Sequence, residues 1–85
     1  MNSPFQVELT ELARAKLRKQ GPQTRDRIVR KLKLAATDPS RDLERLRSVE
    51  SYKLRVGDYR VIVDVDWNRK ILYVLTLGHR RVIYG

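Results

Sequence analysis

The chain has 85 residues, a formal net charge of +9 at pH 7 and no cysteine. This length supports one domain with one modest core, and the absence of cysteine excludes disulfides, thiolate metal sites and a cysteine nucleophile. The N-terminus has no apolar signal core and no run approaches membrane-spanning length, so we expect a cytoplasmic protein without a membrane partner. A charge this positive on so short a chain favours nucleic acid or an acidic protein as partner.

The first half of the chain predicts one strand followed by two helices. Residues 5–9 alternate apolar and polar side chains, as in a strand with one buried face. Thr10 can cap a first helix, which Gly21-Pro22 ends. The apolar side of this helix is formed by three residues, Leu12, Ala13 and Leu17. A second helix at about 23–36 has an apolar stripe at helical spacing, formed by Ile28, Val29, Leu32, Ala35 and Ala36.

The second half predicts three strands after a polar segment. Residues 40–51 are mostly polar, with Leu43 and Leu46 as anchors onto the core. The strands follow at about 52–56, 59–66 and 71–77, and residues 67–70 turn the second hairpin. The last strand is apolar on both faces, which indicates a central position in the sheet. This order, β-α-α-β-β-β, predicts an α+β fold in which a helical hairpin packs on one face of a small, mostly antiparallel sheet.

A two-residue turn signal, Gly57-Asp58, lies between two of the alternating runs. Glycine at the first central position favours a type II′ turn. Such a turn pairs Arg55 with Arg60 and places Lys53 on the same face of the hairpin. The opposite face is apolar and consists of Leu54, Val56, Tyr59 and Val61. Like charges directly opposite each other destabilise a sheet, so we expect an anion to bind at the cationic face. Phosphate, with its high charge density, is the leading candidate.

The second hairpin decides whether Arg80 joins these cations. If residues 68–70 form its loop, Arg60 faces Gly78, and strand alternation then points Arg80 to the Arg60 side. The sheet patch predicted in this way contains four cations, Lys53, Arg55, Arg60 and Arg80.

A second group of cations lies on the two predicted helices, where only Glu11 and Asp26 oppose them. The group consists of Arg14, Lys16, Arg18, Lys19, Arg25, Arg27, Arg30, Lys31 and Lys33. A solvated helical face explains any one of these residues. Together they would hold a phosphate backbone without sequence preference and with a strong salt dependence.

Three segments and one tyrosine carry a family resemblance. They are Tyr-Lys-Leu-Arg at 52–55, Gly-Asp-Tyr-Arg-Val-Ile at 57–62, Leu-Gly-His-Arg-Arg at 77–81, and Tyr84. They resemble the RelE/ParE toxin superfamily, nearest its RelE branch, and the resemblance covers nearly the whole chain. It implies one RelE-like domain over residues 1–85 with the microbial RNase fold, acting as the toxin of a type II toxin–antitoxin system. RelE-like toxins enter the ribosomal A site and cut the mRNA there.

The resemblance also implies which residues act. The family's catalytic positions fall on Lys53, Arg55, Arg60, Arg80 and Tyr84. The basic residues expected to bind RNA or the ribosome are Arg81, Arg14, Arg18, Arg27, Arg30 and Lys31. The RNA's own 2′-OH would attack the adjacent phosphate, and fixed arginines suit the stabilisation of the charge that develops. We assign Arg60 and Arg80 to the scissile phosphate, with Arg55 assisting.

The proton-transfer partner is left open between two residues. Neighbouring cations favour the neutral amine of Lys53, which makes it a candidate base or acid, and a plain phosphate contact is the alternative. Arg55 stands where the best-known RelE pattern has lysine, which shifts attention to His79, the only histidine. A structural role is the alternative for His79. Tyr84 either stacks on a splayed base or closes the core.

The expected partners follow from the same resemblance. They are a cognate, RelB-like antitoxin with an acidic amphipathic segment, the ribosome with its mRNA, and operator DNA through the toxin–antitoxin complex alone. We expect no metal or cofactor, because Asp64 and Asp66 with one distant histidine make a poor metal site. Two other functions remain open, a non-catalytic gyrase inhibitor of the ParE kind and an inactive relative that only binds RNA.

Overall fold

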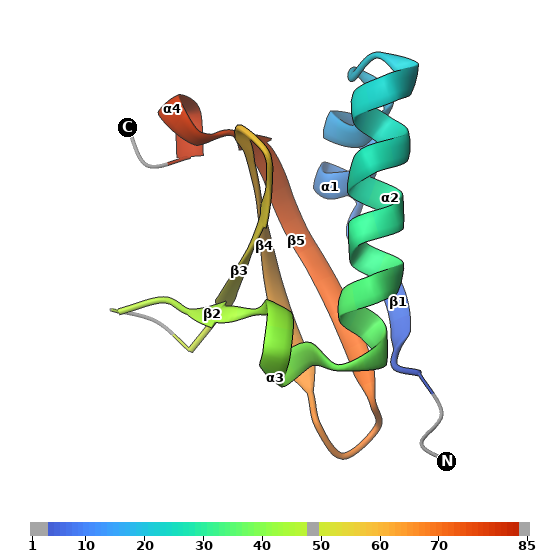
Figure 1. The fold of residues 1–85 in the computed structure, drawn as a ribbon, viewed down its shortest axis with the longest axis vertical. Coiled ribbons are helices and arrows are strands. Elements are labelled where there is room, and N and C mark those ends of the chain that lie inside the picture. Colours follow the sequence, from blue (N-terminus) through green and yellow to red (C-terminus); the bar gives the residue numbers. More distant parts are fainter. Residues whose placement is uncertain (1–3, 48–49, 84–85) are drawn as a thin grey trace.

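The computed structural model describes residues 4–47 and 50–83, which form a layered α+β structure (Figure 1). A five-stranded sheet carries helices α1 and α2 on one face and the short helix α4 on the other. The elements in chain order are β1 (Gln6–Leu9), α1 (Glu11–Arg18), α2 (Pro22–Thr37), α3 (Pro39–Asp42), β2 (Glu44–Arg45), β3 (Tyr52–Val56), β4 (Tyr59–Asp66), β5 (Ile71–His79) and α4 (Arg80–Ile83). The predicted α+β arrangement is confirmed, and α3, β2 and α4 are additions to it.

The strands lie in the order β1-β5-β4-β3-β2. β1 runs parallel to β5, and the other neighbours are antiparallel, so the sheet is mostly antiparallel as predicted. β5 is an interior strand, in agreement with its apolar residues on both faces. The polar segment 40–51, for which no element was predicted, contains part of α3 and the edge strand β2. Its two predicted anchors differ in depth, because Leu43 is buried and Leu46 is half-buried.

The two longer helices begin in different ways. Thr10 caps α1, because its Oγ1 accepts the backbone N–H of Ala13 at 3.1 Å. The same hydroxyl donates to the carbonyl of Leu75 at 2.8 Å and so ties the start of α1 to β5. Pro22 is the first residue of α2, where a proline loses no helical hydrogen bond. The cap therefore ties α1 to the sheet, whereas α2 is held over the same face by its buried residues.

The core lies between these helices and the sheet. Its largest fully buried side chains are Ile28, Leu54, Leu72, Leu77, Val61, Val63 and Val74. The predicted stripe of α2 is confirmed apart from Val29, which is half-buried. Leu12 was predicted on the apolar side of α1 and is 55% exposed. Ala13, predicted on the same side, is buried, and Leu12 points away because neighbouring helical residues are about 100° apart.

The second hairpin reaches the predicted pairing by a different route. Its loop holds four residues, 67–70, one more than the loop that the pairing argument assumed. A bulge then shifts the β4–β5 register by one residue between Ile62 and Val63. Beyond the bulge Arg60 pairs with Gly78, as predicted. The longer loop and the bulge therefore compensate each other.

No helix within the described residues combines the length and the apolar character needed to cross a membrane.

Candidate functional site

The β3–β4 hairpin has the predicted geometry. Gly57 has a φ of 58°, whereas Asp58 is not among the described non-glycine residues with positive φ. In a type II′ turn only the first of the two central residues has a positive φ, and this is the arrangement observed. Arg55 pairs with Arg60, and Lys53 lies two residues before Arg55 on the same face. The register therefore places three cationic residues on the sheet face opposite α1 and α2.

A carboxylate that the sequence analysis missed lies beside two of these cations. β2 pairs Glu44 with Lys53, and a Glu44 oxygen lies 3.6 Å from the Lys53 Nζ. The other Glu44 oxygen lies 3.4 Å from the Arg55 Nε. The Lys53 side chain is 20% exposed and those of Glu44 and Arg55 are more than half exposed. A two-residue strand is too short to show an alternating pattern. The sequence indicated only that the flanking residues, Leu43 and Leu46, contact the core.

Arg60 has a different environment on the same face. It is only 9% exposed, and its Nη1 donates to the carbonyls of Gly57 and Tyr59, both at 2.8 Å. The guanidinium is therefore turned back against the hairpin turn. Hydrogen bonds from a charged donor to these partly buried carbonyls stabilise the folded turn. Its assignment to the scissile phosphate remains a prediction, and only the donors other than Nη1 are left for a ligand.

Arg80 lies at the start of α4 and not on a strand. β5 continues to His79, and helical geometry begins at Arg80, so strand alternation cannot fix the direction of this exposed side chain. The Arg80 backbone N–H donates to the carbonyl of Asp58 at 2.8 Å, which fastens α4 to the β3–β4 turn. Ile83 covers Gly78, where an added Cβ would lie 3.4 Å from the isoleucine side chain. The structure thus brings Arg80 to the hairpin turn through its backbone.

His79 is held by local contacts. Its ring packs edge-on against Tyr59, with 5.7 Å between the ring centroids. Its Nδ1 accepts the backbone N–H of Arg81 at 3.2 Å, within the first turn of α4. A nitrogen that accepts a hydrogen bond carries no proton of its own. These contacts describe a structural role, and Nε2 is the nitrogen left for proton transfer.

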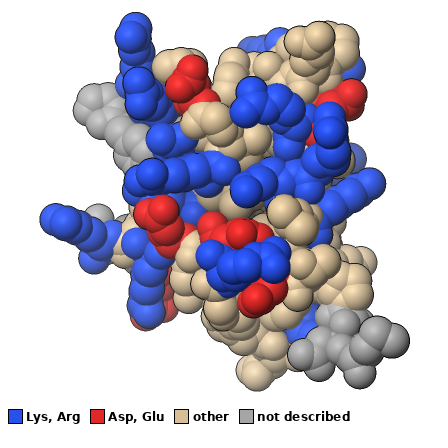
Figure 2. Space-filling view, viewed as in Figure 1, with Lys and Arg blue, Asp and Glu red and all other residues tan. Residues whose placement is uncertain are grey.

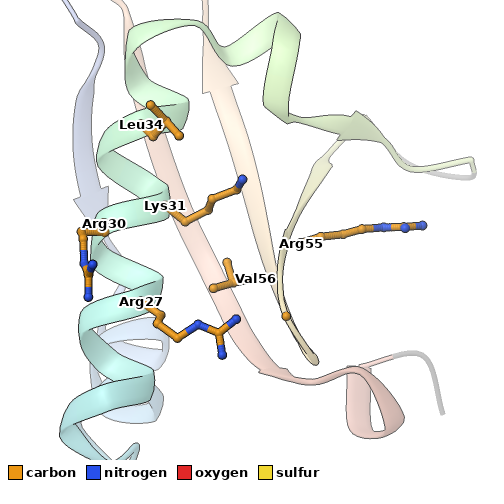
Figure 3. Close-up of a pocket in the computed structure, with 7 residues that line it drawn as sticks. Arg27, Arg30, Lys31, Leu34, Arg55 and Val56 are labelled. Carbon is orange, nitrogen blue, oxygen red and sulfur yellow. The ribbon is translucent and has the colours of Figure 1, made fainter.

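A cationic groove runs between α2 and the outer part of β3 (Figure 3). Its volume is about 470 Å³, and it is lined by Arg27, Arg30, Lys31, Leu34, Arg55, Val56 and Gly57. Figure 3 shows Arg27 and Lys31 pointing from α2 toward the strand, and Arg55 extending away from α2. None of these lining residues is acidic. Arg55 therefore lines this groove together with three helical cations, although its side chain extends away from them.

The face seen in Figure 2 shows the same distribution of charge. Lys and Arg side chains form a band across the middle of the molecule, with acidic side chains mainly at its lower border. Of the residues predicted to bind RNA, five are exposed and Lys31 is half-buried. The exposed ones are Arg14, Arg18, Arg27, Arg30 and Arg81. Tyr84 lies outside the described residues. No group of three or more potential metal ligands occurs in the described part of the chain.

A second hollow of about 610 Å³ lies at the other end of β4 and is acidic. Asp64 and Asp66 line it together with Glu50. The hydroxyl of Ser51 donates to Asp64 at 2.8 Å. The exposed Trp67 borders the same hollow. This acidic hollow therefore lies at the end of β4 away from the turn of the β3–β4 hairpin.

Comparison with solved structures identifies the fold. The toxin–antitoxin complex RelBE2 of Mycobacterium tuberculosis contains a chain that is 26% identical, with a TM-score of 0.83 over 92% of this chain and 100% of that one. The intact RelBE complex of E. coli gives 25% identity and a TM-score of 0.75 over 88% of this chain and 95% of that one. The archaeal RelE–RelB complex of Pyrococcus horikoshii gives 21% identity and a TM-score of 0.75 over 92% and 97%, which shows the fold alone.

Comparison by sequence identifies the family. No curated protein matches this chain. A family model described as the ParE toxin of the type II toxin–antitoxin system, parDE, matches residues 7–84. The match covers nearly the whole chain and agrees with the fold and with the resemblance of the sequence motifs. The chain therefore belongs to the ParE toxin family of type II toxin–antitoxin systems, within the RelE/ParE superfamily.

Proposed function

We propose that this toxin is a ribosome-dependent endoribonuclease that cuts mRNA by attack of the 2′-OH on the adjacent phosphate. The observation that supports the proposal is the pair of cations on the open face of β3, where Lys53 and Arg55 share one carboxylate. A site that holds a carboxylate between two cations has the charge and the spacing to hold a phosphate oxygen. Metal-independent cleavage is part of the proposal.

The reaction requires a proton acceptor, a proton donor and stabilisation of a charged transition state. The O2′–P bond forms while the P–O5′ bond breaks, which gives a 2′,3′-cyclic phosphate and a free 5′-hydroxyl. Arg55 is exposed and permanently charged, so it can bind the phosphoryl oxygens as their charge increases. Lys53 lies beside it and serves as the proton-transfer group, with the Nε2 of His79 as the alternative. Arg60 keeps the turn in place, and Arg80 and Tyr84 complete the predicted set.

The helical cations supply the contact with the ribosome in this proposal. Arg27 and Lys31 line a groove without acidic residues, and Arg14 and Arg18 are exposed on α1. Such a surface binds an RNA backbone through its charge, and the affinity falls steeply with salt. The mRNA strand would then lie across the open face at Arg55.

Programmed ribosomes provide the test. Incubation with the toxin should produce mRNA ends that map to the A site and carry a 2′,3′-cyclic phosphate. Arg55→Ala should lose the cleavage, whereas Arg69→Ala removes the same charge from the far hairpin loop and should keep it. DNA lacks the 2′-OH and should not be cut. Intact mRNA with folded wild-type toxin would reject the proposal.

We also propose an antitoxin of the RelB kind as partner, because the related structures are toxin–antitoxin complexes. The cationic groove fits an acidic amphipathic segment, since Leu34 and Val56 are its apolar lining and its other side chains are basic. Operator DNA would be bound through the complex. Co-expression of the neighbouring open reading frame should restore growth, and failure to do so would count against this partner.

A second candidate function is inhibition of gyrase, and the match to the ParE toxin model favours it. This function uses the scaffold and does not require the cation pair on β3. It predicts trapped gyrase–DNA complexes in expressing cells while mRNA remains intact. It also predicts that Arg55→Ala remains toxic. The two candidates therefore differ in both the damaged macromolecule and the response to one substitution.

A further inference from the structure

Glu44 occupies the position that an anionic ligand of the β3 face would take. Its two carboxylate oxygens lie 3.6 Å from the Lys53 Nζ and 3.4 Å from the Arg55 Nε. Each oxygen thus faces a different cation. A phosphate group that bridged the same two cations would present two oxygens in the same way.

The backbone, and not a chance rotamer, brings the three side chains together. β2 pairs Glu44 directly with Lys53, and Arg55 follows Lys53 by two residues on the same face. Glu44 and Arg55 are therefore diagonal neighbours, a distance that long side chains span. β2 contains only two residues, and Arg45 uses the other pairing position with Tyr52. The short strand delivers one carboxylate to the cationic face.

We propose that Glu44 is an internal anion that competes with the RNA phosphate for Lys53 and Arg55 and thereby sets the selectivity of the site. The proposal rests on the proposed function in that it takes RNA as the ligand of this face. A free strand, with few other contacts, binds weakly because it must displace the carboxylate. A strand that the ribosome or the cationic groove already holds displaces it readily.

The environment of Glu44 allows this exchange. Its side chain is 53% exposed and that of Arg55 is 60% exposed, so the carboxylate can swing into water without opening the core. Ion pairs at such exposure are weak, and they weaken further with salt. Once the carboxylate has left, both cations can neutralise phosphates and release counterions, which steepens the salt dependence of binding.

The test compares two substitutions that remove the same charge. Glu44→Gln removes the internal anion, and Glu8→Gln removes an exposed carboxylate from β1 at the opposite edge of the sheet. The ligand is a short thymidine oligodeoxynucleotide, measured by fluorescence anisotropy over a range of salt. Glu44→Gln should lower the Kd by about three- to tenfold, the size expected for two exposed ion pairs. Glu8→Gln should change the Kd by less than about twofold at physiological salt. β1 and β2 are four strand spacings apart, about 19 Å, whereas the screening length is about 8 Å.

A double substitution separates local competition from net charge. In an Arg55→Gln background the gain from Glu44→Gln should become smaller without vanishing, because the pair with Arg55 is gone and the pair with Lys53 remains. Equal affinities for Glu44→Gln and Glu8→Gln, or a gain that persists unchanged without Arg55, would overturn the proposal. All the substituted side chains are exposed, and circular dichroism verifies that each variant is folded.

The result is independent of the cleavage test. The oligodeoxynucleotide has no 2′-OH, so only binding is measured. If the toxin leaves mRNA intact, the proposed function fails while the Glu44→Gln comparison keeps its meaning. If Glu44→Gln binds like Glu8→Gln while mRNA is cut, competition by Glu44 fails and the endoribonuclease proposal stands.

Discussion

Arg55 and Arg60 face each other across one rung of the β3–β4 hairpin, yet their environments have little in common. The side chain of Arg55 is 60% exposed and lies 3.4 Å from Glu44. Arg60 is 9% exposed and donates to two carbonyls at the turn. The repulsion expected between them is thus relieved within the chain. The same residue type on the same face serves surface electrostatics in one case and the architecture of the turn in the other.

The largest effect should come from Arg60→Ala. The substitution leaves the two turn carbonyls without their donor, so the free energy of unfolding should fall by about 2–4 kcal/mol. This is less than the roughly 3–6 kcal/mol of two hydrogen bonds from a charged group, because both carbonyls are only partly buried. Thermal denaturation followed by circular dichroism should show a Tm lower by about 10–20 °C. Arg69→Ala, at an exposed loop position, is the control and should leave the Tm nearly unchanged. A wild-type Tm for Arg60→Ala would refute the role of Arg60 at the turn.

Arg55→Ala should show the opposite profile. Removal of one fixed charge from the transition state should reduce mRNA cleavage by about 100-fold, the size seen for a single preorganised donor. The free energy of unfolding should change by less than about 1 kcal/mol, because exposed ion pairs contribute little. Single-turnover cleavage on programmed ribosomes and urea denaturation measure the two quantities. Loss of stability together with activity would show that Arg55 and Arg60 do not divide their roles.

Gly57→Ala probes the turn that Arg60 holds. The φ of Gly57 is 58°, where a residue with a β-carbon is strained, so the substitution should lower the folding stability by about 1–2 kcal/mol. The new Cβ would also lie 2.6 Å from the Arg27 guanidinium, whose flexible end must move away. Urea denaturation in an Arg27→Ala background separates the two causes, since only the backbone strain remains there. Gly57→Asn should cost less, and a wild-type stability for Gly57→Ala would contradict the left-handed turn.

Local patterns predicted much of this hairpin and little of what surrounds it. A two-residue turn between alternating runs fixes both the register and the faces, so the pairing of Arg55 with Arg60 followed from sequence. The loop length and the bulge of the β4–β5 hairpin did not, because two opposite shifts of one residue leave the pairing of Arg60 with Gly78 unchanged. Two irregularities that cancel in this way cannot be recognised from the alternation of apolar and polar residues along the strands.

The two unpredicted contacts of the site depend on tertiary structure. Arginine is seldom buried, so nothing local indicated that Arg60 would turn back onto the carbonyls of its own hairpin. Glu44 reaches Lys53 through a strand of two residues, which carries no periodic signal. The excess of basic residues on α2 was evident from the sequence. The groove that they form with β3 was not predicted, because it depends on how the helix packs on the sheet.

A third arginine, Arg41, gives the smallest expected effect and a measure of what an ion pair with one exposed member contributes. Arg41 donates to both oxygens of Asp42, at 3.2 and 2.9 Å, and this hydrogen bond holds the pKa of Asp42 below its ordinary value, against the effect of burial. A depressed carboxyl pKa adds stability that is present above the unfolded-state pKa, about 4, and is lost as the pH falls through the folded value. When the pH is lowered from 6 to 2, the urea midpoint should therefore fall more for the wild type than for Asp42→Asn. High salt should remove this difference between the wild type and Asp42→Asn, because it screens the ion pair. The stability difference between the wild type and Arg60→Ala should persist in high salt, because the partners of Arg60 are uncharged carbonyls. Parallel pH curves for the two proteins would show that even a two-point contact between chain neighbours contributes no measurable stability.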